Sequence, residues 1–542
     1  MAASTPTAKT ELGTINGKAC SSSANAFLGI PFAEPPTGDL RFAPPVAYNT
    51  SYPSAGYNAT TKTLPCIQFG NEFVEDQPWS EDCLFLNVWV PSNASPELKL
   101  PVKFWIHGGG STVGAPSNPT YDGCNLATDA IVVSTAYRLG PLGFLTLPPA
   151  GIQGNMGVQD ILLALEWVQH NIAAFGGDPN HVLLFGQSAG AALTWVISSL
   201  PQAPKLIKAA IAESGAGGRR PSSESLNVLA DLFAENLNCS VNDISCLRSK
   251  PTTLMNTSLP QLPDGSPVTR FGPFVDGKII PDDPMDVGSR VPLVAGANTQ
   301  EGTLFIVAEA NNLPLGLTES DYRRYLQKQF GDNSTTVAKR FPVSNFNNTV
   351  APVFEAMSYM YTLLNYACPT RAALEATRKA GVPAWTYRFG AQPTCAWYDK
   401  IEGTKEALEI LGATHTAEIP FVFSLLTDLP PPNGTCSFNG QEVAISKALV
   451  AAWTSMAAAG NPNDASASAL LGGTWPEWEA SSSLGLVVDD RAPSLGVVDF
   501  SPCDFVEKYY IYAANEKVSG SSKNASATVG RRRRSYGGVR LA

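Results

Sequence analysis

The sequence predicts an α/β fold with a mostly parallel central sheet, and three observations support this prediction. Short apolar runs alternate with helix-like stretches along the chain. Strand, helix, strand in that order is typical of βαβ units, whose strands lie parallel. Hydrophobic residues make up 44% of the 542 residues, which is enough for a large buried core. No internal repeat occurs, so we expect one large body carrying insertions.

The expected strands are short runs of apolar and β-branched residues, at residues 102–107, 130–134, 182–185, 209–212 and 291–295. A helix is expected between the second and third of them, because apolar residues recur there at helical spacing and a glycine pair follows. The residues are Ile161, Leu165, Val168 and Ile172, and then Gly176 with Gly177.

The last part of the chain has a different composition. From about Val518 it is rich in serine, glycine and alanine, then contains Arg531–Arg534, and it shows no apolar periodicity. We therefore expect a single domain over residues 1–516 and a disordered tail over residues 517–542. The proline-rich residues 429–432 are expected to form a loop.

Charge and cysteine content narrow the functional classes. With 37 Lys and Arg against 47 Asp and Glu, the formal charge of −10 argues against a nucleic-acid binder, which must neutralise phosphates. No apolar run is long enough to span a membrane as a helix. Ten cysteines and nine Asn-x-Ser/Thr sequons favour a secreted glycoprotein, although Met1–Pro6 lacks a signal-peptide pattern and an intracellular location stays open. The sequons begin at Asn49, Asn58, Asn93, Asn238, Asn256, Asn333, Asn347, Asn433 and Asn524.

The strongest chemical signal is the motif Gly186-Gln187-Ser188-Ala189-Gly190. A Gly-x-Ser-x-Gly motif also arises in ordinary glycine-rich turns, so its context decides. An apolar run, residues 182–185, precedes it, and a helix-competent run, residues 191–200, follows it. This is the setting of a nucleophile elbow, in which glycine neighbours make room for a sharp turn that exposes the serine. We therefore predict that Ser188 is a nucleophile.

A second motif, His107-Gly108-Gly109-Gly110, stands at the end of the predicted strand 102–107. Consecutive glycines leave backbone N–H groups unobstructed, and the tetrahedral intermediate of an acyl transfer needs such donors around its oxyanion. The N–H of Ala189, directly after the serine, is the expected third donor. A plain flexible turn is the alternative, and the elbow that follows favours the oxyanion interpretation.

A nucleophilic serine needs a base, and the chain has four histidines. His107 belongs to the glycine-rich loop, where a bracing hydrogen bond is the simpler role. His170 falls on the predicted helix beside polar residues and is expected on a solvated face. His181 precedes the strand into the elbow and is expected to be structural. His415 lies in a loop of small residues far downstream, which suits an exposed general base, and elimination favours it.

The acidic residue that orients this base is expected between serine and histidine in the chain. Acidic residues are too numerous for composition to select one of them. Glu301 lies just after the predicted strand 291–295, and the sites of parallel sheets gather at the carboxyl ends of the strands. Glu301 is therefore the candidate.

At this point the residues resemble the type-B carboxylesterase/lipase family, which includes cholinesterases and fungal lipases. The resemblance runs from about Thr14 to Tyr512 and rests on many matches in the same order. They are Gly29–Ala33, Ser80–Val88, Tyr137–Gly140, Asn155–Asp160, Phe175–Pro179 and the elbow itself. The resemblance implies an α/β-hydrolase fold with Ser188, Glu301 and His415 as a catalytic triad. It also implies an oxyanion hole made by the N–H groups of Gly109, Gly110 and Ala189.

The same resemblance implies several structural pairs. Two disulfides would join Cys66 to Cys83 and Cys239 to Cys246. Two salt bridges would join Arg41 to Glu81 and Arg138 to Asp178. The remaining six cysteines allow many pairings, which the sequence leaves open; they are Cys20, Cys124, Cys368, Cys395, Cys436 and Cys503.

The sequence departs from the cholinesterases within this family. Gln187 stands where they carry glutamate, and Ser111 follows the glycine triplet where they place an aromatic residue. The loop between Cys66 and Cys83 holds only 16 residues and one tryptophan, close to Cys83. The aromatic residues that would bind a quaternary ammonium through cation–π contacts are therefore not found at these positions. Ser111, Gln187 and Phe271 are expected to line the substrate pocket, with core packing as the alternative for Phe271.

These inferences predict a serine hydrolase that cleaves carboxylic esters through an acyl-enzyme, without a metal or other cofactor. The expected substrate, and the only expected partner, is a short, medium or bulky uncharged ester. A lipase, and an acyl transferase or lactone-forming enzyme, are the alternatives that the same triad allows. A non-catalytic binding protein is disfavoured because the set of site residues is complete. The oligomeric state stays open.

Overall fold

The computed structural model describes residues 5–70, 73–260, 271–309, 316–346, 351–398, 401, 404–425 and 436–510. The predicted loop 429–432 and the predicted tail, including Arg531–Arg534, lie outside these residues. None of the helices in the described ranges combines the length and the apolar character needed to cross a lipid bilayer.

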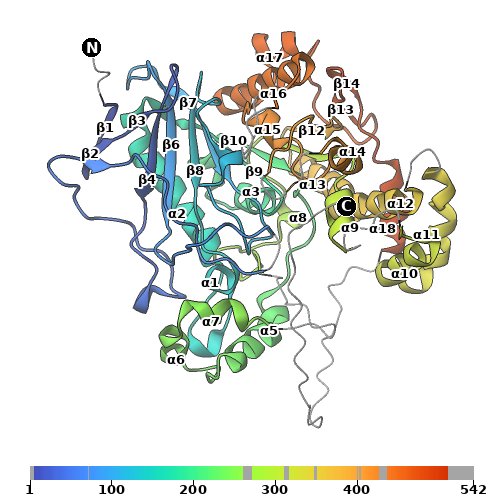
Figure 1. Ribbon diagram of the computed structural model, residues 1–542, viewed down its shortest axis with the longest axis horizontal. Helices are drawn as coiled ribbons and strands as arrows, with labels where there is room; N and C mark the ends of the chain where they lie inside the picture. The colour runs from blue at the N-terminus through green and yellow to red at the C-terminus, as the bar shows by residue number, and fades with distance from the viewer. Residues whose placement is uncertain are drawn as a thin grey trace.

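An eleven-stranded sheet organises the protein (Figure 1). Its strand order is β14-β13-β12-β11-β10-β9-β7-β8-β6-β4-β3. The strands from β13 to β8 are parallel, whereas β14 at one edge and β6, β4 and β3 at the other are antiparallel. The prediction of a mostly parallel sheet is thus confirmed. The bounds are β3 Lys18–Ala19, β4 Ala24–Pro31, β6 Phe85–Pro91, β7 Leu100–Ile106, β8 Ile131–Thr135, β9 Gly177–Gln187, β10 Ala209–Glu213, β11 Leu293–Asn298, β12 Ala384–Phe389, β13 Leu484–Val488 and β14 Pro493–Val497.

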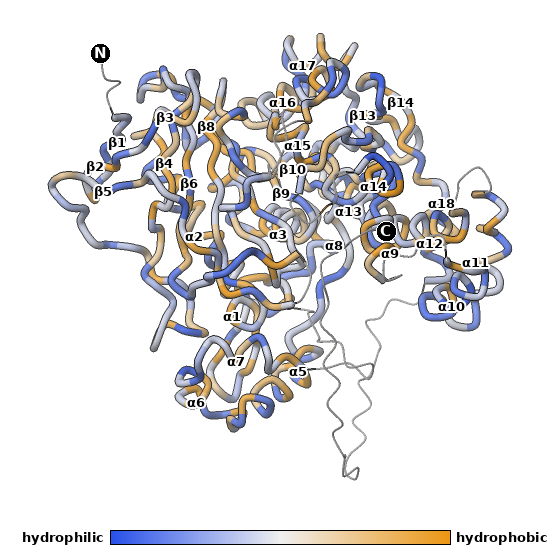
Figure 2. The backbone as a smooth tube through the Cα atoms, viewed as in Figure 1, coloured by the Kyte–Doolittle hydropathy of each residue, from blue (hydrophilic) through white to orange (hydrophobic). Residues whose placement is uncertain are grey.

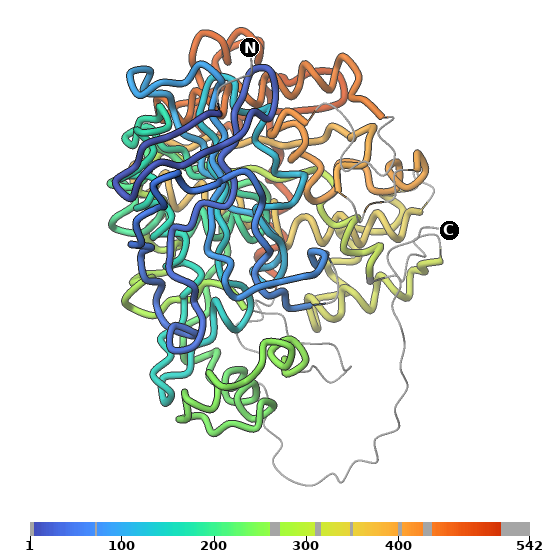
Figure 3. The backbone as a smooth tube through the Cα atoms, turned by 60° about the vertical axis from the view of Figure 1, so that its left-hand side comes forward, coloured from blue at the N-terminus to red at the C-terminus, as the bar shows by residue number. Residues whose placement is uncertain are grey.

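A smaller sheet of three strands lies near the N-terminus. Its strands are β1 (Thr7–Thr10), β2 (Gly13–Asn16) and β5 (Tyr57–Asn58). Figure 3, turned from the view of Figure 1, brings this N-terminal part of the chain forward.

Helices connect and cover the strands. The predicted helix between β8 and β9 is α2 (Met156–Asn171), which ends in a short 3₁₀ turn and then Gly176 at φ 90°. The others are α1 Gly140–Phe144, α3 Ala189–Ser199, α4 Ala203–Leu206, α5 Ser223–Asn236, α6 Ile244–Ser249, α7 Thr252–Thr257, α8 Pro284–Val287, α9 Gly302–Glu309, α10 Glu319–Phe330, α11 Ser334–Arg340, α12 Pro352–Thr362, α13 Cys368–Lys379, α14 Lys405–Leu411, α15 Ile419–Val422, α16 Gly440–Ala459, α17 Ala465–Leu470 and α18 Ser501–Tyr509. In Figure 1, α5–α7 form one peripheral group and α10–α12 with α18 form another.

Both faces of the central, parallel strands of the large sheet are buried, as that arrangement requires. On β7, Val102, Phe104 and Ile106 point into a core shared with α2, α3, α12 and α13. Trp105, on the other face of the same strand, packs in a second core with residues of α14–α16. Figure 2 shows hydrophobic residues along the strands and many hydrophilic ones on the peripheral α10 and α11. The molecule therefore has three layers, with the sheet in the middle.

Five disulfides use all ten cysteines, every one of which lies in the described part of the chain. The structure joins Cys66 to Cys83 and Cys239 to Cys246, the two pairs that the resemblance implied. It also pairs the cysteines that the sequence left open, as Cys20–Cys124, Cys368–Cys503 and Cys395–Cys436. The second of these three fastens α18 to the start of α13.

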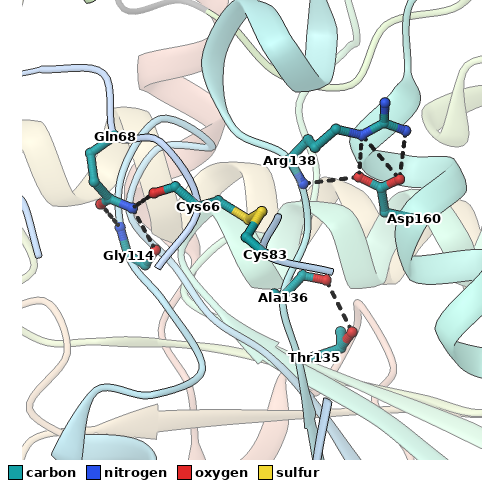
Figure 4. The surroundings of a disulfide bond; sticks show 8 residues. All are labelled: Cys66, Gln68, Cys83, Gly114, Thr135, Ala136, Arg138 and Asp160. Atoms are coloured by element: carbon teal, nitrogen blue, oxygen red, sulfur yellow. Dashed lines mark hydrogen bonds and ion pairs between the residues drawn. A yellow bond between two sulfur atoms is a disulfide. The ribbon is translucent and has the colours of Figure 1, made fainter. Parts of the chain in front are cut away.

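The structure contains one of the two implied salt bridges and corrects the other. Arg41 and Glu81 lie 2.7 Å apart, as implied. Arg138 pairs with Asp160 and not with Asp178: its side chain and its backbone N–H donate to the Asp160 carboxylate at 2.7–3.2 Å (Figure 4). The reason is the packing of α2, which turns its buried Asp160 toward the end of β8, where Arg138 lies. Asp178 is placed elsewhere, at the start of β9.

Candidate active site

Ser188 occupies a strained turn between β9 and α3, with φ 58° and ψ −123°. The turn packs against the end of β7, which is why glycines flank it. A Cβ atom on Gly186 or Gly190 would lie 2.7 Å or 2.1 Å from the carbonyl oxygen of Ile106. The Ser188 N–H donates to the carbonyl oxygen of Glu213 at 2.8 Å, which fastens the turn to β10. This is the geometry that a nucleophile elbow needs.

The glycine-rich loop after β7 lies directly against this turn. A Cβ on Gly108 would come within 3.1 Å of the Ser188 Cβ, and one on Gly109 within 2.2 Å of the Val113 carbonyl oxygen. Gly109 and Gly110 have φ values of 103° and 61°, which glycine adopts without steric cost. Within the described residues, no hydrogen bond occupies the N–H groups of Gly109, Gly110 or Ala189. These donors are therefore available to a ligand beside Ser188.

His415 and Glu301 form a short contact beside the elbow. The His415 Nδ1 atom lies 2.6 Å from Glu301 Oε2, and the other carboxylate oxygen accepts the N–H of Asn298 at 2.7 Å. An isolated bridge between Gln300 and Thr414 aligns the two loops that carry them. Because Nδ1 faces the carboxylate, Nε2 is the ring nitrogen on the side of the imidazole away from Glu301.

His415 is not the exposed residue that its small-residue loop suggested. Only 4% of its surface is exposed. The rings of Phe305 and Tyr366 lie 5.1 Å and 4.8 Å from the imidazole and cover it. The Gln187 amide nitrogen lies 3.3 Å from Nε2 and 3.4 Å from Nδ1, so a neutral group stands beside the imidazole. His415 is thus buried in the wall of a cavity, where its partners fix the ring.

The other three histidines take no part in the contacts around Glu301 and His415. His107 is buried, and burial lowers its pKa to about 4 although its contact with the Gly108 carbonyl opposes the shift. His107 is therefore neutral and stacks on Tyr137. His170 is exposed on α2, and His181 lies 3.2 Å from Asp178. Among the four histidines, His415 alone lines the cavity described next.

A cavity of about 430 Å³ opens beside Ser188 and His415. Its floor is the glycine-rich loop, and its walls are mainly aromatic and aliphatic, including Phe69, Phe73, Tyr121, Leu304, Phe305, Trp397, Tyr398, Ile401 and Ile419. Glu75 is the one carboxylate among the described lining residues; it accepts a hydrogen bond from Asn118 at 3.0 Å. The cavity therefore offers mostly apolar contact around a few polar atoms, as small-molecule sites do.

The three residues expected in the pocket take different places. Gln187 lines the cavity, next to Ser188. Ser111 is buried behind the glycine-rich loop, where its carbonyl accepts the N–H of Gly140 at 2.7 Å. Phe271 is 7% exposed and borders a separate small cavity with Phe144 and Leu145, which agrees with the core-packing alternative.

Sequence reasoning missed most of the aromatic wall. Trp397 and Tyr398 come from the loop after β12, and Phe305 comes from α9. Their positions depend on the Cys395–Cys436 disulfide and on helix packing, and no local motif announces either. The described residues contain no group of three or more His, Cys, Asp or Glu side chains arranged to hold a metal ion.

Comparison with known proteins agrees with this geometry. The model of the carboxylesterase family matches residues 4–491. The fumonisin B1 esterase of Sphingopyxis macrogoltabida is 33% identical over 87% of this chain and 84% of its own. The cholinesterase of Mus musculus is 33% identical over 86% of this chain and 79% of its own. The para-nitrobenzyl esterase of Bacillus subtilis is 29% identical over 89% and 94%. The chain therefore belongs to the carboxylesterase family and is a carboxylic ester hydrolase with an α/β-hydrolase fold.

Proposed function

We propose that the protein cleaves carboxylic esters through an acyl-enzyme formed on Ser188. The observation that carries the proposal is the 2.6 Å contact between His415 and Glu301, in the wall of the cavity into which the Ser188 turn also faces. A nucleophile, a base and an orienting carboxylate gathered at one cavity are the parts that such catalysis needs.

Each side chain has a defined role in the proposed reaction. Ser188 Oγ attacks the ester carbonyl while His415 Nε2 takes its proton, and the protonated imidazole then gives that proton to the leaving alcohol. Water repeats the sequence on the acyl-enzyme and restores Ser188. Glu301 accepts a hydrogen bond from the Nδ1–H of His415, which fixes the tautomer and stabilises the imidazolium.

The oxyanion is proposed to bind the N–H groups of Gly109, Gly110 and Ala189. These donors stand on both sides of Ser188, at the glycine-rich loop and at the start of α3. The glycine-rich loop that carries two of these N–H groups is closely packed, since a Cβ on Gly109 would meet the Val113 carbonyl. Donors fixed before the reaction stabilise developing charge without reorganising.

The cavity walls suggest the substrate class. Aromatic and aliphatic side chains dominate them, and Gln187 places a neutral amide beside the imidazole. We therefore propose uncharged esters of short or medium length, or bulky ones that fill an apolar space of about 430 Å³. The rate on p-nitrophenyl esters from acetate upward should pass through a maximum and then fall as the acyl chain outgrows the cavity.

Labelling tests the proposed nucleophile. A p-nitrophenyl alkylphosphonate should modify one serine, Ser188, and abolish ester turnover in proportion to the label incorporated. Peptide mapping identifies the modified residue. Label on a different serine, with turnover lost, would assign the nucleophile elsewhere.

We further propose that the protein is a secreted glycoprotein. The six sequon asparagines in the described residues are all exposed or partly exposed; they are Asn49, Asn58, Asn93, Asn238, Asn256 and Asn333. Five disulfides persist best in an oxidising compartment. Expression in a eukaryotic secretory host should give a protein whose mass falls on treatment with an N-glycosidase, and an unchanged mass would contradict glycosylation.

A further inference from the structure

Two more buried acidic side chains lie behind Glu301 and His415. Glu213 ends β10 and Glu418 precedes α15, and at most 1% of either residue is exposed. In the described part of the chain neither carboxyl forms an ion pair with a lysine or arginine. A buried carboxylate without such a partner is costly, so these two groups call for a physical explanation.

The register of three parallel strands places Glu213. It is aligned with Gly296 of β11, and Gly296 is aligned with Tyr387 of β12. Gly296 leaves room for the Tyr387 ring, because a Cβ there would lie 2.3 Å from it. Trp453 of α16 covers these aligned residues. Its indole N–H donates to Glu213 Oε1 at 2.7 Å, and its ring lies 6.0 Å from that of Tyr387. Glu213 and Tyr387 therefore share one buried face of the sheet.

Asn298, two residues after Gly296 on β11, connects Glu418 to the proposed triad. Its side-chain amide donates to Glu418 Oε2 at 2.5 Å and to the carbonyl oxygen of Thr414 at 2.7 Å. Its backbone N–H donates to Glu301 Oε1 at 2.7 Å. Thr414 directly precedes His415, so Asn298 holds both sides of the contact between imidazole and carboxylate.

This cluster has too few hydrogen-bond donors if both carboxyls are ionised. Among the described residues, Glu213 Oε2, Glu418 Oε1 and Asn298 Oδ1 are buried without a hydrogen-bond partner, and so is the Tyr387 hydroxyl. An ionised carboxylate only accepts, whereas a protonated carboxyl also donates one O–H. Protonation supplies the missing donors, and buried polar groups in native proteins are nearly always paired.

The electrostatics agree with the count of donors. Burial, and then the charge of Glu418, raise the pKa of Glu213 well above its usual range, although the Trp453 N–H opposes the shift. Burial, and then the charge of Glu301, raise the pKa of Glu418 to about 7 against the opposing hydrogen bond from Asn298 and the nearby His415. The titratable groups that face the pair come from several elements and are Glu301, His415, Tyr387, Tyr366 and Tyr121. All three tyrosines are neutral near pH 7 because burial raises their pKa values further.

We propose that Glu213 and Glu418 form a carboxyl pair that keeps at least one proton at neutral pH and, through Asn298, positions the proposed triad. Neither residue lines the substrate cavity, so both are positioning residues. A protonated Glu418 adds no negative charge beside His415, so the carboxyl group of Glu301 alone contacts the imidazole. The positioning role rests on the proposed function; the retained proton does not.

Infrared spectroscopy tests the retained proton without requiring activity. A protonated carboxyl has a C=O stretch separate from the bands of a carboxylate. In a Ser188→Ala background at pH 6 we expect buried-acid bands, one removed by Glu418→Gln and another by Glu213→Gln. The band assigned to Glu418 should fade as the pH passes through about 7. Spectra in which neither substitution removes an acid band at pH 6 would overturn the proposal whatever the nucleophile is.

Kinetics test the positioning role. Glutamine has the shape of a protonated glutamate and both accepts and donates hydrogen bonds. Glu418→Gln should therefore keep kcat within about threefold of wild type at pH 6. The acid limb of its kcat/KM profile should not move. Glu418→Leu removes both hydrogen-bonding atoms and should lower kcat about tenfold or more with KM nearly unchanged. Phosphonate titration normalises the rates to folded enzyme. An acid limb that moves to lower pH by half a unit or more in Glu418→Gln would show an ionised Glu418, and a fully active Glu418→Leu would remove the positioning role.

Discussion

Arg138 and Asp160 form a two-pronged ion pair in the core, with the Arg138 Nη2 and Nε atoms 2.7 Å and 2.9 Å from the two carboxylate oxygens. The side chain of Asp160 is fully buried, and Arg138 also donates from Nη1 to the carbonyl oxygen of Ala43 at 2.7 Å. The pair thus joins the end of β8, the buried face of α2 and the N-terminal region at one point.

Asp160→Asn should destabilise the protein strongly, because it leaves the Arg138 charge buried beside a neutral group. The expected loss is about 3 kcal/mol in the free energy of unfolding. Asp178→Asn is the matched control, and its cost should stay below about 1 kcal/mol because Asp178 lies near the surface and an asparagine oxygen can still accept the Asn180 N–H. Urea unfolding of both variants measures the difference, and equal losses would contradict the pairing in the structure.

Ser188→Ala should fold normally and lose ester turnover almost completely, by about four orders of magnitude or more in kcat. Glu301→Gln should reduce kcat by roughly three orders of magnitude with a small change in KM, because an amide no longer fixes the His415 tautomer. Thermal unfolding and far-UV circular dichroism verify that the variants are folded. Turnover near the wild-type level in either variant would remove that residue from the proposed triad.

The rate should also fall on acidification. His415 acts as a base only when its ring is neutral, so kcat/KM should decrease as pH drops through the range in which histidines take up a proton. His107 contributes nothing to this limb, since burial keeps its pKa near 4. A profile that stays flat down to about pH 4 would exclude a histidine base.

The parts of the site that are local in sequence could be predicted, and those made by packing could not. The Ser188 elbow and the glycine-rich loop are each encoded within five residues, because the turn itself requires glycine at fixed places. The partner of Arg138 depends on the rotation of α2, so the resemblance alone pointed to Asp178. The burial of His415 depends on Phe305 and Tyr366, which are distant in the chain.

The same distinction between local and packing-dependent features explains why some strands were not predicted from the sequence. β4 (Ala24–Pro31) is buried on both faces at nearly every position, so its sequence lacks the alternation that marks a half-exposed strand. β12 (Ala384–Phe389) carries Arg388, whose charge is typical of a surface position, although the rest of the strand is buried. The cluster of Glu213, Glu418 and Asn298 is assembled from three separate segments, and no spacing in the sequence signals it.

Lys103 offers a test of buried charge away from the active site. It lies on β7, is 0% exposed, and its Nζ atom has no hydrogen-bond partner among the described residues. Burial lowers its pKa from 10.5 to about 8, with Asp129 opposing the shift. Between these two values the unfolded chain binds more protons than the native one, so this group makes stability rise with pH from about 8 to 10.5.

Lys103→Met should therefore stabilise the protein at pH 7, where the full penalty acts, by up to about 3 kcal/mol. The gain should shrink as pH approaches 10.5. Lys208→Met, at an exposed position, is the control and should change stability little at either pH. Urea unfolding at pH 7 and pH 10 provides the comparison, and a gain that does not depend on pH would show that Lys103 is not held in a depressed titration range.

The loop between Cys66 and Cys83 is the candidate lid, so its mobility is a test of whether the enzyme behaves as an esterase or as a lipase. A lipase lid must swing away at an oil surface, and this loop is held at several points. The Gln68 side chain donates to the carbonyls of Cys66 and Gly114 and accepts the Gly114 N–H (Figure 4), and the Tyr398 hydroxyl donates to the Phe73 carbonyl at 3.3 Å.

We therefore expect no interfacial activation. Closing a loop of 16 residues by a disulfide also removes conformational entropy from the unfolded chain, worth about 3 kcal/mol in the chain-entropy model. The rate on tributyrin should rise smoothly with concentration and level off before the emulsion forms. The control is a soluble p-nitrophenyl ester measured with and without an inert oil phase, which separates activation from adsorption. A sharp increase at the point of emulsification would mean that another segment acts as a lid, and the enzyme should then be classed as a lipase.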